Sequence, residues 1–342
     1  MAHEITERDG VFTVREAAWH GLAHVFGDYP TREEAQAIAH PWEPVGEPIY
    51  RREPVVTADG ELGEQYVEVD GHQLIARSDD GGALGVVGSS YEPVTNSEMY
   101  DIAEALEGQD SGSVRYETGG SLKGGAKVWL LLRLAEPLMV KGDPQGATIP
   151  YYALQNNHDG YGSFRGQALM TRIVCDNTSQ IADLEAQARG TEFVFRHTRS
   201  VKDRIEDAKQ ALTGWRHSVE EWQRLSEHLI DLRVEPYQAG VFIESFIPMP
   251  PENLISERVR SNIEKAQGDL RSILYGPTCA DVSHTAYGLV QSAVEYAEHY
   301  RKSNSQEGRF KRAYLERSPL TSGAVALARE AVLAPIPTVR AK

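Results

Sequence analysis

The residues best suited to chemistry stand together in the stretch QNNHDGYGSFRG, which begins at position 155. It groups amide, imidazole, carboxylate and guanidinium side chains around glycines: Asn156, Asn157, His158, Asp159 and Arg165. The flanking segments alternate between polar and apolar residues as strands do. This grouping predicts either an enzyme active site or a hairpin on a polar, ligand-facing sheet. Because an Asp-Gly pair is typical of turns, positions 159 and 160 favour the hairpin.

A second chemical pattern lies in the apolar run KVWLLLRL, residues 127–134. Alternate residues of a strand share a face, so Lys127, Trp129 and Arg133 lie together. An unpaired cation is very costly in a packed core, so we expect this face to be open. Cations for phosphates beside an aromatic ring for base stacking are typical of surfaces that bind single-stranded nucleic acid. The alternative is a solvated face whose Trp129 is covered by a loop or a neighbouring segment.

The turn GGSLKGG, residues 119–125, has the composition of a phosphate-binding loop. In a P-loop, however, the last glycine is followed by Lys and then Ser or Thr, whereas Gly125 is followed by Ala126. The turn also lies between two strand patterns instead of before a helix. The sequence therefore predicts a flexible hairpin from which Lys123 can touch a backbone phosphate.

A basic segment, FRHTRSVKDR (195–204), leads into a long helical pattern. The free amides of a helix N-terminus bind phosphate oxygens. Arg196, Arg199 and Lys202 oppose the helix dipole there, which favours an anion bound nearby. The alternative is a solvated basic turn whose cations pair with Asp203 and Glu206.

These patterns together give one predicted nucleic-acid-binding set. Its members are Lys123, Lys127, Trp129, Arg133, Asn156, Asn157, Arg165, Arg196, Arg199 and Lys202. By parity, Arg165 and Arg172 lie on opposite faces of their strand, so one of them is expected to pair with a carboxylate or to lie at an edge. No catalytic residue, metal ligand or cofactor is predicted.

The elements that must position this set are strands joined by short turns, which predict an antiparallel meander. The strand patterns cover residues 113–117, 127–140, 148–157 and 163–175. Apolar residues then recur at spacings of three and four from Val201 to Leu232, until Pro236 stops the helix. The predicted fold class is α+β, with an antiparallel β-meander packed on a long helix (a β-β-β-α core) and a helical C-terminal region. The second half of the long helix is the expected contact between subunits.

Shorter elements flank this core. Helices are predicted at 31–39, 96–107, 238–247, 255–275, 284–302 and 309–316. Residues 41–55, which contain four prolines, predict an extended connection, and the pair Asp70-Gly71 predicts a hairpin turn. The predicted organisation is an N-terminal segment, an α+β core, a helical region and a frayed tail, at 1–50, 51–235, 236–330 and 331–342.

Charge is distributed unevenly along the 342 residues, whose formal net charge is −15. Residues 112–216 carry 14 Lys and Arg against 11 Asp and Glu, a balance of +3, so the remainder carries −18. An acidic body around a mildly basic centre is expected if one surface alone meets a polyanion. The two cysteines, Cys175 and Cys279, cannot make a disulfide framework and predict isolated thiols in a reducing cytoplasm. Without a secretory signal or an apolar run of about 18 residues, no membrane partner is expected.

Several spaced motifs resemble a phage- and plasmid-borne family known as domain of unknown function 932. They are AWHGLA (18–23), SYEPVTNSEMYDI (90–102), GGSLKGGAKVWLLLRL (119–134), LQNNHDGYGSF (154–164), TRIVCDNT (171–178) and FRHTRS (195–200). The resemblance covers residues 15–300, with Ala23 standing where a glycine is expected. It implies a mobile element with its own DNA metabolism, acting in a bacterial host cell, but no activity.

The predicted meander and helix are also similar in topology to single-strand annealing proteins of the Rad-type, RecT and Red-beta groups. That similarity implies a ring or filament of subunits around a groove that holds phosphates and leaves bases exposed. It also implies a phage exonuclease or a host single-strand-binding protein as further partners.

The sequence therefore predicts a phage or prophage protein that binds and anneals single-stranded DNA as a homo-oligomer, without bond-making chemistry. One alternative is a metal-dependent phosphodiesterase or nuclease that uses His158, Asp159 and His197. Another is a host-interaction protein whose acidic surface mimics DNA.

Overall fold

The computed structural model describes residues 6–15, 23–56, 59–110, 114–134, 136–172, 177–180, 192–198, 201, 215–300 and 323–335. The chain forms two compact units, each assembled from three segments. Unit 1 comprises 1–135, 152–166 and 192–213, and unit 2 comprises 136–151, 167–191 and 214–342. Both units are discontinuous in sequence, unlike the linear segments that the sequence predicts. The mixture of helices with antiparallel strands confirms the predicted α+β class.

A nine-stranded sheet holds the predicted meander as four neighbouring strands. These are β6 (Val114–Leu122), β7 (Lys127–Leu134), β9 (Ala147–Asn157) and β10 (Phe164–Arg172). The strands follow the order β11 (Asn177–Gln180), β10, β9, β7, β6, β1 (Val11–Val14) and β2 (His24–Phe26). Two further strands pair at the side of this path, β12 (Glu192–Phe195) with β10 and β8 (Leu138–Met139) with β9. The tight turns between consecutive strands explain the antiparallel pairing of β6 with β7.

Strand β7 is buried on both faces, as a continuous apolar run of this length permits. Val128, Leu130 and Leu132 are buried on one face, and Trp129 and Leu131 are buried on the other. Glycines of β6 make room for these side chains. A Cβ atom added at Gly120 would lie 2.7 Å from the Trp129 ring, and one at Gly119 would lie 2.9 Å from Leu130.

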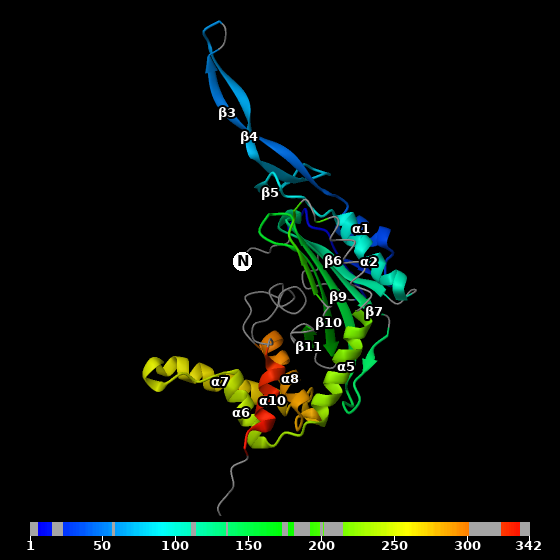
Figure 1. The fold of residues 1–342 in the computed structure, drawn as a ribbon, viewed down its shortest axis with the longest axis vertical. Helices are drawn as coiled ribbons and strands as arrows, with labels where there is room; N and C mark the ends of the chain where they lie inside the picture. The colour runs from blue at the N-terminus through cyan, green and yellow to red at the C-terminus, as the bar shows by residue number, and fades with distance from the viewer. Residues whose placement is uncertain are drawn as a thin grey trace, which may run out of the picture. The chain divides into compact units, whose positions relative to one another are not determined.

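Two capped helices cover part of unit 1, as the sequence predicts. Helix α1 (Arg32–Ala39) begins with a capping box between Thr31 and Glu34. Helix α2 (Asn96–Asp110) buries Met99 and Ile102 on one face. Both helices contact β6 and each other, and so cover part of the sheet in unit 1 (Figure 1).

A separate three-stranded sheet contains a long two-stranded ribbon (Figure 1). Its strands are β3 (Pro44–Val56), β4 (Leu62–Arg77) and β5 (Ala83–Gly88). The extended connection predicted for residues 41–55 is in fact mostly strand β3, whose prolines are tolerated because the strand lies at an edge. The hairpin predicted at Asp70-Gly71 is wrong. Strand β4 continues through both residues, and the pairing with β3 shifts register there, between Pro48 and Tyr50.

The described helices of unit 2 pack around α8 (Ala286–Glu295), all of whose residues are buried. Its neighbours are α5 (Trp215–Asp231), α6 (Pro236–Phe246), α7 (Glu257–Leu274) and α10 (Ala324–Leu333). A π-helical turn, Tyr296–Tyr300, follows α8, and short 3-10 turns lie at Lys123–Gly125, Glu252–Leu254 and Ala280–Val282. The helix predicted at 309–316 lies outside the described residues.

Helix α5 is the described part of the predicted long helix, since residues 202–214 lie outside the description. Its apolar stripe is buried within one chain, at Val219, Trp222, Leu225 and Leu229. The contact between subunits expected at the second half of the long helix stays a prediction, and the exposed side of α5 is the one that bears Glu220, Arg224 and His228. In the described part of the chain, no helix combines the length and the apolar character that a membrane crossing requires.

Candidate functional site

The cationic face predicted on β7 is closed. Trp129 is 1% exposed and Leu131 is also buried, so the open surface expected here is wrong. Strand parity placed these side chains on one face correctly, but parity does not say what covers a face. Lys127 and Arg133 lie near the two ends of the strand, and both are half-buried. The alternative interpretation, a covered Trp129, is the one that the structure bears out.

Arg133 lies beside a carboxylate of the same unit. Its side chain is 17% exposed, and its Nη1 lies 3.8 Å from Oε2 of Glu117. Glu117 occupies the point at which the pairing of β6 with β7 shifts register. Burial raises the pKa of Glu117, while Arg133 and Arg15 oppose the rise. Because Arg133 already lies beside this carboxylate, it is less available to a phosphate than an unpaired arginine would be.

The two asparagines of the opening stretch build the hairpin. Asn156 is 0% exposed and donates from Nδ2 to the carbonyl oxygen of Val94, at 2.9 Å. Asn157 donates to the carbonyl oxygen of Ser163 at 3.1 Å, and its own carbonyl oxygen accepts from the Tyr91 hydroxyl at 2.9 Å. The prediction that these amides steer a ligand is wrong, because their hydrogen bonds hold the two strands and the segment at Tyr91 together.

The turn between β9 and β10 presents one aromatic ring to solvent. The Asp159 carboxylate accepts from the backbone amide of Tyr161 at 2.9 Å, and Gly160 has a φ of +80°. A Cβ at Gly160 would lie 2.8 Å from Val87 of β5, so glycine is required by space as well as by conformation. Tyr161 at the tip is 94% exposed.

Two adjoining cavities, of about 370 and about 330 Å³, lie beside this turn in unit 1. We call them together the His197 hollow. Both are lined by Tyr91, Gly160, Tyr161 and His197. The first adds Val86, Val87, Gly88, Ser90 and Asp159, and the second adds Gly162, Ser163, Arg196 and Thr198.

His197 is the polar group buried deepest in this hollow. It is 6% exposed, and its ring stacks on Tyr91 with centroids 4.7 Å apart. Neither ring nitrogen has a hydrogen-bond partner among the described residues. Burial lowers the pKa of His197 to about 4. The backbone of Glu92 and the carboxylate of Asp159 oppose this shift, although neither lies in hydrogen-bond geometry with the ring. The imidazole is therefore neutral near pH 7.

The remaining predicted cations differ in how open they are. Arg196 is exposed on the rim of the hollow, and Lys123 is exposed in the turn before β7. Arg165 is partly exposed, and its Nε lies 3.7 Å from a carboxylate oxygen of Glu192. Arg172 is buried, with bonds of 2.7 and 3.0 Å to Asp143, which confirms that one arginine of β10 pairs with a carboxylate. The predicted residues Arg199 and Lys202 lie outside the described part of the chain.

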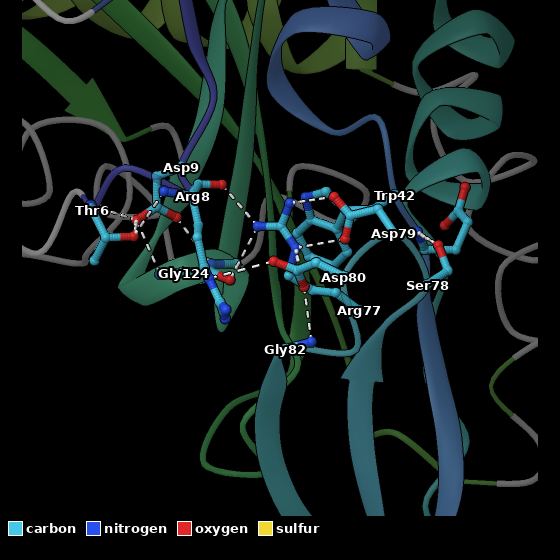
Figure 2. A network of polar contacts seen from close by, with 12 residues as sticks. Thr6, Arg8, Asp9, Trp42, Arg77, Ser78, Asp79, Asp80, Gly82 and Gly124 are labelled. Atoms are coloured by element: carbon cyan, nitrogen blue, oxygen red, sulfur yellow. Dashed lines mark hydrogen bonds and ion pairs between the residues drawn. The ribbon is translucent and has the colours of Figure 1, made fainter.

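The glycine-rich turn 119–125 is ordered around the carboxylate of Asp9 (Figure 2). Lys123, Gly124 and Gly125 all have positive φ, and such a run aims successive amides at one point. The two carboxylate oxygens of Asp9 accept from the amides of Gly124 and Gly125, each at 2.9 Å. The flexible hairpin predicted here is therefore pinned by the N-terminal segment.

Arg77 completes the same network (Figure 2). Its guanidinium donates to both carboxylate oxygens of Asp79 at 2.9 and 2.7 Å, and to the carbonyl oxygens of Arg8 and Gly124 at 2.8 and 3.2 Å. It also lies over the ring of Trp42, 4.6 Å from the centroid. Burial alone would lower the pKa of Arg77, but the bond to Asp79 and the nearby carboxylates raise it above its usual value.

The residues proposed for phosphodiesterase chemistry come together only in part. Asp159 and His197 line the hollow, but His158 is fully buried and its Nε2 lies 3.3 Å from Oδ1 of Asn96. Burial lowers the pKa of His158 to about 3, with His197 and His40 adding to the shift. Within the described ranges, no three His, Cys, Asp or Glu side chains gather as metal ligands do. The enzyme interpretation stays an untested prediction.

The predicted binding set omits Tyr91 and Tyr161. Tyr161 carries a usable signal, because an aromatic residue between two glycines at a turn tip is expected to be exposed. Tyr91 carries none, because its role depends on contact with His197, more than 100 residues later in the chain.

Comparison with known proteins gives one match. The model of the family described as Domain of unknown function (DUF932) matches residues 83–318, which include β5, the meander and most of the described helices. No curated protein and no solved structure matches the chain.

Proposed function

The chain belongs to the family described as Domain of unknown function (DUF932), and because that description names no activity, we propose from the residues themselves that it binds single-stranded DNA. The binding surface is the end of unit 1 at which the turn 158–163 meets the segment 196–198. The sequence predicted the meander face as the surface, and the closed state of β7 moves the proposal to this turn.

One observation carries the proposal: Tyr161, 94% exposed, lines the same cavity as the exposed Arg196. A single strand offers two features that a duplex hides or spaces differently, unstacked base faces and a flexible phosphate chain. An exposed aromatic ring supports base stacking, which is worth about 1–3 kcal/mol per base. An exposed guanidinium beside it supports a phosphate contact.

Two further cations extend this surface beyond the hollow. Lys123 is exposed, and Lys127 begins β7 next to Ala126, whose carbonyl oxygen accepts from the backbone amide of His158 at 2.8 Å. This bond ties the start of β7 to the start of the turn 158–163. Phosphates that replace counterions along these side chains would make binding fall steeply with salt. Arg133 and Arg165 contribute less, because each already faces a carboxylate.

We further propose that the protein promotes annealing of complementary single strands without nucleotide or metal. It would act in the cytoplasm of a bacterium that carries a phage or another mobile element. Several copies would act along one strand, as a ring or a filament. The surface offered for contact between copies is the ribbon of β3 and β4, whose exposed apolar side chains are Tyr50, Val56, Leu62 and Tyr66. A two-stranded ribbon is marginally stable alone, so covering these side chains would stabilise it. A phage exonuclease or a host single-strand-binding protein remains a proposed partner.

The test is a salt titration of binding to a fluorescein-labelled oligothymidylate, followed by anisotropy. We expect binding by the wild type at low salt, and a salt slope smaller by about 1.4 in Lys127→Ala with Arg196→Ala, since about 0.7 counterion is released per phosphate of a single strand. The matched control is Arg258→Ala with Lys265→Ala, which removes the same charge from exposed positions of α7.

An equal loss in the control pair would show non-specific attraction instead of a defined surface. If the wild type ignores the oligonucleotide at every salt concentration, DNA binding is ruled out. Capture of a host protein by the same sample would then favour the DNA-mimic interpretation. Light scattering tests assembly separately, and a strict monomer at micromolar concentration with DNA present would remove the ring or filament.

A further inference from the structure

The His197 hollow contains a polar group that a phosphate can satisfy only in part, because a phosphate offers acceptors alone. His197 is buried, lines both cavities, and has no hydrogen-bond partner at either ring nitrogen among the described residues. Leaving a buried polar group unpaired is unfavourable, because the group loses its bonds to water without replacement. A buried, unpaired ring that faces a cavity therefore indicates a ligand that would complete its bonds.

The protonation state of His197 selects the kind of ligand. A neutral imidazole offers one N–H donor and one nitrogen acceptor. A phosphate has acceptors only, and the Asp159 carboxylate in the same hollow would repel it. The edge of a nucleobase offers donors and acceptors side by side without net charge, which matches His197 and Asp159 together.

The walls of the hollow match the faces of a base. The Tyr91 and His197 rings are stacked, with an angle of 22° between their planes. Tyr161 stands at the mouth, where its exposed ring is free to lie on a planar ligand. The first cavity has a volume of about 370 Å³, which falls within the range of roughly 300–1,000 Å³ for small-molecule sites.

We propose that the His197 hollow takes up one base of the bound strand, turned out of the stack, with its edge on His197 and its neighbouring phosphate at Arg196. This inference rests on the proposed function, and it adds that binding recognises bases as well as phosphates. The base is held by hydrogen bonds common to several base edges, so affinity should depend on the presence of a base and only weakly on its identity.

The experiment compares two ten-nucleotide strands, an oligothymidylate and a strand of the same length made wholly of abasic tetrahydrofuran units. The abasic strand reports contacts with the phosphates, and the ratio of the two dissociation constants reports the bases. For the wild type we expect the thymidine strand to bind at least tenfold more tightly. In His197→Leu the ratio should fall by about fivefold, with unchanged affinity for the abasic strand and an unchanged salt slope.

Two variants distinguish the loss of hydrogen bonds at His197 from a general effect of replacing a histidine. His197→Gln keeps one donor and one acceptor and should restore most of the ratio. His72→Leu removes an exposed histidine of β4 and should leave the ratio unchanged. Thermal unfolding of each variant shows that it is folded.

The outcomes distinguish this inference from the proposed function. If the wild type binds both strands equally, or if His197→Leu keeps the full ratio, the base pocket is wrong while DNA binding stands. If neither strand binds, DNA binding fails, and the base pocket that rests on it fails too.

Discussion

Arg77 and His197 are polar side chains buried to nearly the same degree in unit 1, 5% and 6% exposed, yet their surroundings are opposite. Arg77 has bonds to Asp79 and to two backbone carbonyl oxygens, and it stacks on Trp42. His197 stacks on Tyr91 but has no hydrogen-bond partner among the described residues.

These two surroundings separate a structural polar group from a candidate binding group. A buried charge is tolerated only when it is paired and hydrogen-bonded, so the closed network of Arg77 serves the fold. A buried imidazole that stays neutral avoids the cost of charge, and its unused nitrogens remain available to a ligand. Burial alone therefore does not distinguish the two roles, whereas unpaired nitrogens on a side chain that lines a cavity do.

The largest expected effect is on the Arg77 side of this comparison. Arg77→Leu leaves the carbonyl oxygens of Arg8 and Gly124 without their donor, at about 1–3 kcal/mol for each, whereas the carboxylate of Asp79 is 36% exposed and returns to water. We expect the free energy of unfolding in urea to fall by the sum of these two costs, followed by tryptophan fluorescence. Arg52→Leu, at an exposed ribbon position, should change it by less than about 1 kcal/mol. Equal stability of both variants would show that the network of Arg77 contributes nothing.

Acid should destabilise the fold through its neutral histidines. Burial lowers the pKa values of His40, His158 and His197 to about 4, 3 and 4, from an ordinary 6.5. The unfolded chain regains the ordinary value and binds more protons below pH 6.5. The stability is thus fully present above pH 6.5 and is lost as the pH falls toward 4, on the order of 3 kcal/mol for His40 alone.

Urea unfolding between pH 7.5 and pH 5 measures this loss, and His197→Gln, which lacks one titrating ring, should show a shallower decline. A free energy of unfolding that stays constant over this range would contradict neutral burial of the three rings.

A smaller effect compares two histidines directly. The His40 ring is bonded to the Tyr100 hydroxyl at 3.0 Å and to the Gly120 carbonyl oxygen at 2.8 Å. His40→Leu leaves both groups unpaired and should cost about 1–3 kcal/mol per group. His197→Leu leaves nothing unpaired among the described residues, so its free energy of unfolding should stay within about 1 kcal/mol of the wild type. A loss in His197→Leu as large as in His40→Leu would show that His197 is a structural residue.

The smallest expected effect is at the rim of the hollow. Tyr161→Ala removes a ring that is almost wholly exposed, so stability should change by less than about 0.5 kcal/mol. Tyr275→Ala, at the end of α7, is the matched control for an exposed tyrosine outside both the hollow and the ribbon. Binding to oligothymidylate should weaken about tenfold in Tyr161→Ala alone. Equal binding by both variants would remove Tyr161 from the proposed surface.

Local patterns predicted much of the fold. The capping residues placed α1 and α2, and the alternation of residues placed the four strands of the meander, because these signals act between neighbours in the chain. The long pairing of β3 with β4 was not foreseen, since its register depends on contacts between the two strands and since Asp70-Gly71 also satisfies the pattern of a turn.

The candidate site was predicted less well. Arg196 and the turn at 158–163 were singled out, and both line the hollow. Trp129, Asn156 and Asn157 were singled out as well, and all of them are buried parts of the framework. The residue type was suitable in each case, and the error lay in what covers the residue.

Composition and short spacings are enough to predict the strands, the capped helices, the uneven charge along the chain and the aromatic tip of the turn. Which polar groups find hydrogen-bond partners depends instead on contacts between residues far apart in the sequence. Asp9 reaches the amides of the 119–125 turn across more than 100 residues, while His197 meets Tyr91 and no hydrogen-bond partner among the described residues. The parity of a strand gives the direction of a side chain, but the segment that packs over it comes from elsewhere in the chain.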